Sequence, residues 1–356
     1  MFRMNWPETE LMFGQYWGMF SEFAPETSGD ADFAFHGWAL QRIPQIRLTQ
    51  KFAGAWTVAG AIMKPYDPGL TDVNFTTNLP AGPTGNTLGL EGSASETPQV
   101  QGKLAFEQDL WGKAPFYGRP RPFTAQVAAG WQRTRYRSND VGGAGNALNT
   151  FGQNAFRAVQ GTLFIPVVPT YSNNLAGSAS ITAEYYIGQG CSFLSMTRDQ
   201  DNSWFNFAGR DAFGRFMYNR VLMNQYGGYV QAQYWFSNQW FLNAAWAFNR
   251  NFAINSGTSA ALAGQQGAAN PQGYMYAANG GADQTKLWSE YDLTLWYRPI
   301  EAIKFGLQYA YERTDFLQKL NNPVVGAAGQ VQGQPDAGAK NFGESHRIQF
   351  VAMMFF

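Results

Sequence analysis

The sequence contains one cysteine, two histidines and few charged side chains, and it lacks a long apolar segment. Cys191 alone cannot build a disulfide framework or a multi-cysteine metal site. No stretch approaches the roughly 18 consecutive apolar residues that a transmembrane helix needs. The net charge is zero, with 25 basic and 25 acidic residues, so no global field attracts nucleic acid. These shortages exclude a helical membrane protein, a disulfide-stapled domain and a nucleic-acid-binding protein.

Aromatic side chains and glycine are abundant. Aromatic residues make up 16% of the 356 residues and charged residues only 14%, against about 25% charged residues in an average soluble domain. A disordered chain carries far less apolar surface than this. The composition therefore predicts a folded protein that places its many rings somewhere other than a water-exposed surface.

Alternation of apolar and polar residues predicts strands along most of the chain. In 344–356, His346, Ile348 and Phe350 lie on one parity while Ser345 and Arg347 lie on the other. The same period of two occurs at 303–312, 287–298, 242–249, 226–236, 178–187, 159–165, 123–132, 100–107 and 45–51, and more weakly at 8–17 and 55–64. Most of these roughly twelve segments are longer than the five or six residues typical of soluble strands.

The connections between the strands alternate between short turns and long loops. The long loops are expected near 18–40, 65–98, 138–153, 188–224, 252–286 and 313–343. Long antiparallel strands with long loops at one end are typical of a transmembrane β-barrel in the bacterial outer membrane, here one barrel domain over 1–356. A soluble β-sandwich or propeller also alternates, but the strand length and the one-sided loops disfavour it.

The direction of the strands predicts how many precede this sequence. If the long loops are extracellular, 8–17 runs outward and the short strand Phe2–Asn5 runs inward. An even-stranded barrel begins with an outward strand, so we expect an odd number of strands before Met1 and a truncated N-terminus. A hairpin hidden in 188–224, pairing Trp204–Phe207 with Phe213–Tyr218, would change the count.

Two segments resemble a known family. Leu11–Phe20, reading LMFGQYWGMF, and Arg42–Gln50, reading RIPQIRLTQ, resemble the Gly-Gln-aromatic and Arg-x-x-Gln-x-Arg strands of DcaP-like trimeric porins of Gram-negative outer membranes. Phe356 resembles the C-terminal aromatic residue that the barrel-assembly machinery recognises. The resemblance implies a homotrimer of sixteen-stranded barrels, about thirteen strands of which lie in this chain. It also implies an inward-folded loop in each pore and passage of small organic anions such as dicarboxylates. No cofactor is expected.

The parity of the strands assigns ionisable side chains to the lumen. The pore-lining candidates are Arg47, Lys51, Lys103, Glu107, Glu184, Glu290, Asp292, Arg298, Lys304, Glu312 and Arg347. Six cations against five anions give little net selectivity. Arg47 and Lys51 nevertheless share one strand and predict a cationic wall for anions, unless they are lumen charges paired with carboxylates on the next strand. Small and amide side chains at other lumen positions, such as Gln126 and Gln160, predict water-filled space.

The loop 18–40 contains acidic candidates for a constriction. These are Glu22, Glu26, Asp30 and Asp32, interspersed with aromatic residues. The loop folds into the pore, caps the barrel or latches a neighbouring subunit, and the sequence does not choose among these. The segment Thr197–Asn202 resembles a fragment of a calcium loop but lacks its glycine and bidentate glutamate, so we expect no metal site there.

Aromatic and basic residues near strand ends predict contacts with lipid. Aromatic girdle candidates are Trp17, Trp56, Trp131, Trp240, Trp246 and Tyr297. The cluster of Arg133, Arg135 and Arg137 at the outer end of one strand is suited to the phosphates of lipopolysaccharide.

Catalysis is disfavoured by the placement of the two histidines. His36 lies in a loop, and His346 is on the lipid-facing parity while the adjacent Ser345 points to the other face, so these two cannot form a dyad. Cys191 is interpreted as an incidental thiol. The sequence therefore predicts a water-filled porin for passive diffusion of small hydrophilic solutes. The alternative is a structural or partner-binding barrel whose lumen is occluded.

Overall fold

The computed structural model describes residues 1–20, 23–27, 42–65, 97–138, 150–170, 174–191, 203–210, 216–222, 224–252, 285–316, 321–325, 331–335 and 342–354. One antiparallel sheet of 13 strands dominates this part of the chain, in the order β1-β2-β3-β4-β5-β8-β9-β10-β13-β14-β15-β16-β19. No helix among the described residues is long and apolar enough to cross a membrane.

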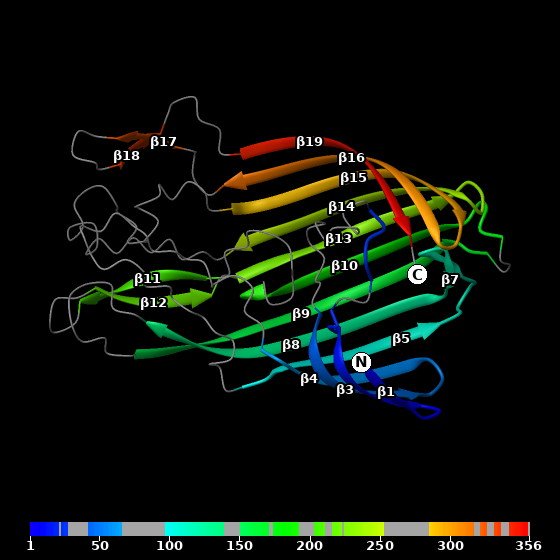
Figure 1. Ribbon diagram of the computed structural model, residues 1–356, viewed down its shortest axis with the longest axis horizontal. Coiled ribbons are helices and arrows are strands. Elements are labelled where there is room, and N and C mark those ends of the chain that lie inside the picture. Colours follow the sequence, from blue (N-terminus) through cyan, green and yellow to red (C-terminus); the bar gives the residue numbers. More distant parts are fainter. Residues whose placement is uncertain are drawn as a thin grey trace.

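The strands of the large sheet are β1 (Phe2–Asn5), β2 (Thr9–Trp17), β3 (Arg42–Phe52), β4 (Trp56–Met63), β5 (Gln99–Gln108), β8 (Phe123–Ser138), β9 (Thr150–Val168), β10 (Ala179–Gln189), β13 (Asn224–Trp235), β14 (Trp240–Phe252), β15 (Thr285–Ile300), β16 (Ile303–Phe316) and β19 (Phe342–Met354). Three separate hairpins are β6 (Ala114–Phe116) with β7 (Arg119–Arg121), β11 (Ser203–Arg210) with β12 (Phe216–Leu222), and β17 (Asn321–Val325) with β18 (Val331–Pro335). Figure 1 shows the long strands side by side, with β11–β12 and β17–β18 toward the left-hand end of the molecule.

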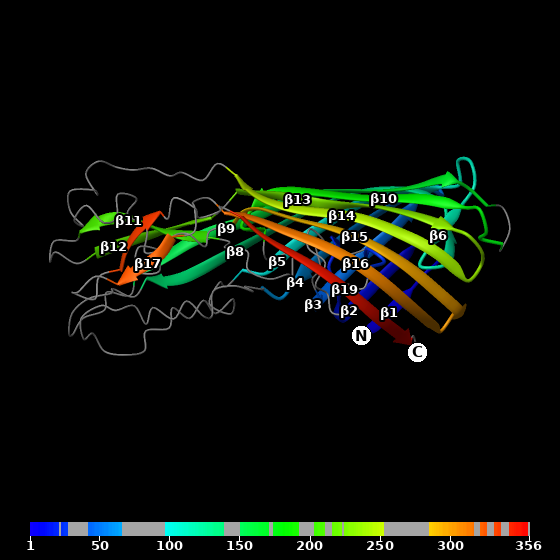
Figure 2. The ribbon, with the colours of Figure 1, turned by 90° about the horizontal axis from the view of Figure 1, so that it is seen from above.

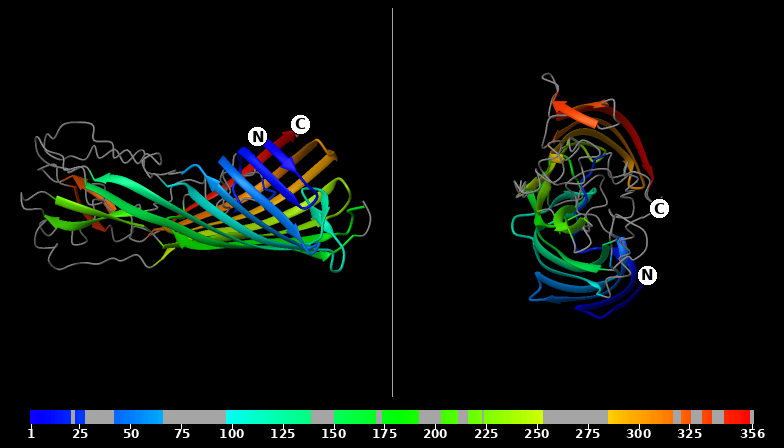
Figure 3. Two further views of the ribbon diagram at one scale, coloured as in Figure 1. Left: turned by 90° about the horizontal axis from the view of Figure 1, so that it is seen from below. Right: turned by 90° about the vertical axis from the view of Figure 1, so that its left-hand side faces the viewer.

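The sheet curls into a barrel wall. The end-on view in Figure 3 shows it as an open curve, and Figure 2 shows β1 and β19, its two edge strands, on the same side of the molecule. Within the described residues, β1 pairs with β2 and β19 pairs with β16, and the two edge strands do not pair with each other.

The sheet carries polar side chains on its inner face and apolar side chains on its outer face, the opposite of a soluble protein. On β13, the polar Gln231 and Gln233 are at most 2% exposed, whereas Val230 and Tyr234 are 42% and 45% exposed. Exposed aliphatic and aromatic side chains continue around the outer face, as with Ile348 at 77%. Water does not favour such a surface, but lipid does, because the backbone polar groups are already paired within the sheet.

The predicted strands are confirmed, and so is the all-β transmembrane barrel class. Each alternating segment belongs to a strand of the large sheet. The hairpin considered within 188–224 is present as β11–β12, but its second strand lies at Phe216–Leu222, later than the expected Phe213–Tyr218, and it stays outside the large sheet. The hairpins β6–β7 and β17–β18 were not predicted. Their strands have three to five residues, too few to establish a period, and Pro115, Pro120 and Pro323 within them normally argue against a strand.

Candidate functional site

The segment that follows β2 folds into the lumen. We call residues 18–20 and 23–27 the inner belt. Its side chains are buried against the inner face of the sheet, with Met19, Phe20, Phe23, Glu26 and Thr27 all at most 2% exposed. Of the three arrangements that the sequence left open for the loop 18–40, this part of it adopts the inward fold.

Inward-facing amide side chains hold the backbone of the inner belt. Met19 N donates to Gln101 Oε1 on β5 at 2.8 Å, and Gln126 Nε2 on β8 donates to Met19 O at 3.1 Å. Gln160 Nε2 on β9 donates to Phe20 O at 3.1 Å, and the Tyr229 hydroxyl on β13 donates to Phe23 O. The belt therefore crosses the inner face from β5 to β13, and side chains of the wall bond to its backbone on each of these four strands.

These contacts correct one expectation about the lumen. The amide side chains were expected to leave water-filled space, but Gln126 and Gln160 are at most 4% exposed and bind the belt instead. The sequence pattern places such residues on the inner face but contains no information on which distant segment will use their hydrogen bonds.

Glu26 is the most heavily bonded residue of the inner belt. Its backbone N donates to Gln231 Oε1 at 2.6 Å, and its carbonyl accepts from Asn243 Nδ2 and Trp296 Nε1, each at 2.9 Å. Its carboxylate accepts from Gln233 Nε2 and lies 3.5 Å from Lys304 Nζ.

The cation that pairs with Glu26 is itself enclosed by aromatic rings. Lys304 Nζ lies 4.3 Å from the centroid of Trp296 and 4.9 Å from that of Tyr117. Both partners of the ion pair are buried, with side-chain exposures of 2% for Lys304 and 3% for Glu26. A buried pair with several further hydrogen bonds is the arrangement that compensates for the desolvation of both charges.

A second inward element comes from the short-turn end of the barrel. The hairpin β6–β7 turns at Tyr117 and Gly118, both with positive φ (51° and 68°), the geometry of a two-residue type I′ turn. Glycine is favoured at 118 by the positive φ, and a Cβ there would displace the flexible guanidinium of Arg298. The tight turn directs Tyr117 toward the lumen, where its hydroxyl donates to Pro25 O at 3.4 Å.

The inner belt and the hairpin meet in an aromatic septum formed by Phe23, Phe116 and Phe164. The ring centroids of Phe23 and Phe116 are 5.3 Å apart, and those of Phe116 and Phe164 are 5.7 Å apart. The guanidinium of Arg121 covers the Phe23 ring at 4.1 Å. Two segments far apart in the sequence thus narrow the lumen together, which is why neither was predicted to do so in combination.

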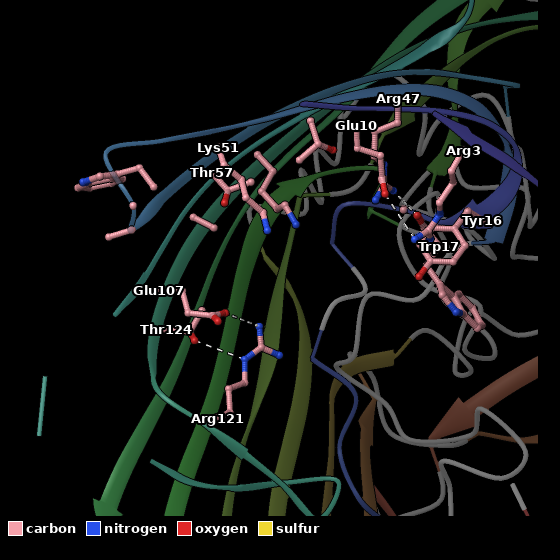
Figure 4. Close-up of a pocket in the computed structure, with 17 residues that line it drawn as sticks. Arg3, Glu10, Tyr16, Trp17, Arg47, Lys51, Thr57, Glu107, Arg121 and Thr124 are labelled. Atoms are coloured by element: carbon pink, nitrogen blue, oxygen red, sulfur yellow. Dashed lines mark hydrogen bonds and ion pairs between the residues drawn. The ribbon is translucent and has the colours of Figure 1, made fainter. Parts of the chain in front are cut away.

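A polar cavity of about 500 Å³ remains beside the belt. Its ionisable lining consists of the cations Arg3, Arg47, Lys51, Lys103 and Arg121 and the anions Glu10 and Glu107. Five cations against two anions leave a net charge of +3 on this wall. Figure 4 shows Arg121 directed toward Glu107 and Thr124, and Arg3 beside Glu10, so both carboxylates are neutralised by neighbouring cations.

Arg47 has two roles in this geometry. It lines the cavity, but its Nε also donates to Gln45 Oε1 at 3.0 Å and its Nη2 donates to Trp17 O, where the belt begins. Arg3 and Lys51 are exposed, and Lys103 and Arg121 are half-buried. Arg3 and Arg121 were missed by the sequence argument, because β1 was treated as a short stub and β7 as part of a connection.

The remaining predicted pore-lining residues gather on the other side of the curved sheet. Glu290 and Asp292 on β15, Glu312 on β16 and Arg347 on β19 form one cluster, with Arg347 Nη2 at 3.4 Å from both Glu290 and Glu312. Glu184 is buried on the inner face of β10, and Arg298 bonds to Tyr117 O and Glu301 O. Glu22, Asp30, Asp32 and the calcium-like segment 197–202 lie outside the described residues, as does His36.

His346 and Ser345 do not face each other in the structure. The Tyr309 hydroxyl and His346 Nδ1 are 2.7 Å apart on the outer face, while Ser345 belongs to the opposite parity. Cys191 lies just beyond β10 and is buried, and burial raises the pKa of its thiol. Nor do three described His, Cys, Asp or Glu side chains come together so as to hold a metal ion.

The apolar outer face, the polar inner face and the tilted antiparallel strands define the class of protein. They are the features of a bacterial outer-membrane β-barrel. The chain is therefore an outer-membrane β-barrel protein, with an inner belt, an internal hairpin and a basic cavity in its lumen.

Comparisons with known proteins concern the fold. No protein-family model matches the chain, and no curated protein has a significantly similar sequence. Similar solved structures include OprB of Pseudomonas putida, with 10% identity and a TM-score of 0.47 over 97% of this chain and 70% of OprB. They also include the NanC porin, with 12% identity and a TM-score of 0.26 over 98% of this chain and 100% of NanC. The copper transporter OprC has 14% identity and a TM-score of 0.37 over 87% of this chain and 42% of OprC.

Proposed function

We propose that this protein is a porin, forming a water-filled channel for passive diffusion of small hydrophilic solutes, organic anions such as dicarboxylates among them. The observation that carries the proposal is the basic cavity of about 500 Å³ on the polar inner face. Charges that line a narrow pore select ions by their sign. The net charge of +3 favours anions.

The inner belt supports a filter rather than a wide pore. It is bonded to the wall, narrows the lumen and leaves the cavity beside it. The belt then limits the size of a passing solute, and the charged wall of the cavity selects the sign of its charge. The septum of Phe23, Phe116 and Phe164 favours the second candidate, an occluded barrel that binds a partner. We place the porin first because an occluded barrel has no need of a basic cavity.

Three finer features complete the proposal. The segments Leu11–Phe20 and Arg42–Gln50 support membership of the DcaP-like porins and, with it, a homotrimer. Arg133 is exposed on the outer face of β8, two residues beyond the outward-facing Trp131, which supports contact with lipopolysaccharide phosphates. Cofactors and nucleic acid play no part in this function.

Conductance in planar bilayers tests the function. The full-length protein is expected to insert in groups of three conductance steps and to show anion preference under a salt gradient. The double substitution Lys51→Gln/Lys103→Gln removes two cations from the cavity wall, so it is expected to lower the anion to cation permeability ratio several-fold, most strongly at low salt. Lys64→Gln is the matched control, since Lys64 is exposed beyond β4 and does not line the cavity.

Each outcome separates the candidates. If the double variant conducts with an unchanged anion to cation permeability ratio, the cations of the cavity do not determine the ion selectivity. A folded, heat-modifiable barrel that gives no steps at all would contradict the channel and support the occluded, partner-binding barrel.

A further inference from the structure

Arg121 connects the basic cavity with the aromatic septum. It lies at the base of the hairpin β6–β7, opposite the buried Ala114. The residue lines the cavity, and its guanidinium carbon lies 4.1 Å from the centroid of the Phe23 ring and 5.5 Å from that of Phe116. A change in the position of this one group therefore acts on the cavity and on the septum together.

Two hydrogen bonds that join Arg121 to the wall are long. Its Nη2 donates to Glu107 Oε2 at 3.3 Å, and its Nε donates to Thr124 Oγ1 at 3.4 Å (Figure 4). A guanidinium and a carboxylate that are free to orient form two parallel bonds of about 2.7–2.9 Å, which are stronger. The carboxylate of a solute in the cavity can therefore replace Glu107, whose side chain is 51% exposed.

The strand that carries Glu107 leaves room for such a solute. Alternate residues of a strand face the same side, so Lys103, Ala105 and Glu107 follow one another along the lumen side of β5, and all three line the cavity. The small Ala105 leaves space between Lys103 and the pair of Glu107 and Arg121. A dicarboxylate in this space can bind Lys103 with one carboxylate and Arg121 with the other.

We propose that an anionic solute bound in the cavity draws the guanidinium of Arg121 away from the Phe23 ring and thereby loosens the septum. A cation over an aromatic ring is held by the electrostatic attraction of the ring face, and this attraction is lost when the cation moves off the ring. The septum is then closed while the cavity is empty, and it parts when a carboxylate occupies the cavity. This inference rests on the proposed function, and it explains how one barrel has both an occluding septum and a basic cavity.

Labelling of a buried cysteine measures the opening of the septum. Ala114 is fully buried in one cluster with Phe23 and Phe164, so Ala114→Cys in a Cys191→Ser background places a thiol where a water-soluble maleimide reaches it only when the septum parts. With the full-length protein in detergent micelles, succinate is expected to raise the labelling rate about fivefold, the effect of losing one cation–π contact of ordinary strength. Succinamide, the uncharged analogue, and sodium chloride at equal ionic strength are expected to leave the rate unchanged.

Variants in the same reporter background test the part played by Arg121. Arg121→Met keeps an unbranched side chain but cannot bind a carboxylate, so its labelling rate should not depend on succinate. Arg119→Met is the matched control, because Arg119 is exposed on the same strand β7 and does not line the cavity, and it should keep the full response. Glu107→Gln removes the competing carboxylate and should lower the succinate concentration that gives half the effect. If Arg121→Met does not fold, Arg121→Lys replaces it, and its half-effect concentration should rise several-fold because lysine does not form paired bonds.

The outcomes separate this coupling from the proposed function. A labelling rate that succinate leaves unchanged would overturn the coupling, even in a barrel that conducts anions. A response that persists in full in Arg121→Met, or an unchanged half-effect concentration in Arg121→Lys, would overturn the role of Arg121. A response that is lost in Arg121→Met and kept in Arg119→Met upholds the coupling even if planar bilayers show no current, and in that case the diffusion function alone fails.

Discussion

Removing the charge of Glu26 is expected to release the inner belt from the wall. Glu26→Gln retains the shape of the side chain and an oxygen that accepts from Gln233, but it leaves Lys304 as a buried cation without its anion. Breaking a buried pair by removing one partner costs about 3–5 kcal/mol. Since each 1.4 kcal/mol is a factor of ten, even the lower figure shifts the ratio of docked to released belt by roughly 100-fold.

A cysteine reporter in the belt measures this ratio. Thr27 is fully buried at the end of the described belt, so Thr27→Cys in a Cys191→Ser background places one thiol where only a released belt exposes it. When opening and closing are fast, the labelling rate follows the released population. We therefore expect a water-soluble maleimide to label the reporter about 100-fold faster in Glu26→Gln, with larger and noisier single-channel currents.

The double variant is the control for the ion pair. Lys304→Met keeps an unbranched side chain between Tyr117 and Trp296 and removes the cation. Glu26→Gln/Lys304→Met should label more slowly than either single variant, because no unpaired charge remains buried. Equal labelling rates in the wild type, the single variants and the double variant would refute the role of this pair in holding the belt.

Three further predictions concern the wall and the septum. Cys191 is buried with a raised thiol pKa, so at pH 8 it stays protonated and should react with iodoacetamide only after unfolding; rapid alkylation of the native protein would contradict its burial. Gly228→Ala should prevent stable barrel formation, since φ is +155° and a Cβ would lie 1.9 Å from Glu184 O, whereas Gly60→Ala meets nothing within 4 Å and should leave the heat-modifiability midpoint unchanged. Phe23→Ala should destabilise the septum by about 3–5 kcal/mol and increase the single-channel conductance; an unchanged conductance would show that the septum does not lie in the ion path.

The strands of the wall were predictable because lipid imposes a strict alternation on them. In a segment such as 226–236, buried residues of the inner face alternate with exposed residues of the outer face. This period of two can be recognised without knowing which strands lie on either side. The hairpin β6–β7 was not predictable in this way, because its three-residue strands contain prolines and form within a connection. Its position inside the barrel depends on contacts with Phe23 and Phe164, which come from distant parts of the chain.

The candidate site was predicted in its residue types but not in its grouping. Parity placed Lys51, Lys103, Glu290 and Asp292 on the inner face, and a sum over the lumen gave nearly equal numbers of both signs. The structure separates these charges into a basic cavity and an acidic cluster, because the strands that carry them belong to opposite ends of the strand order of the sheet. Selectivity depends on that separation and not on the sum.

The sequence by itself determined the class of the protein, the faces of its strands and the identity of most lumen charges, since each of these depends on a period of two along the chain. Only the tertiary structure decided what fills the lumen. The inner belt is held by Gln101, Gln126, Gln160, Gln231 and Lys304, residues that lie between 82 and 278 positions from their partners in the belt. Hydrogen bonds and ion pairs over such separations follow from how the sheet curls, and local sequence patterns do not encode them.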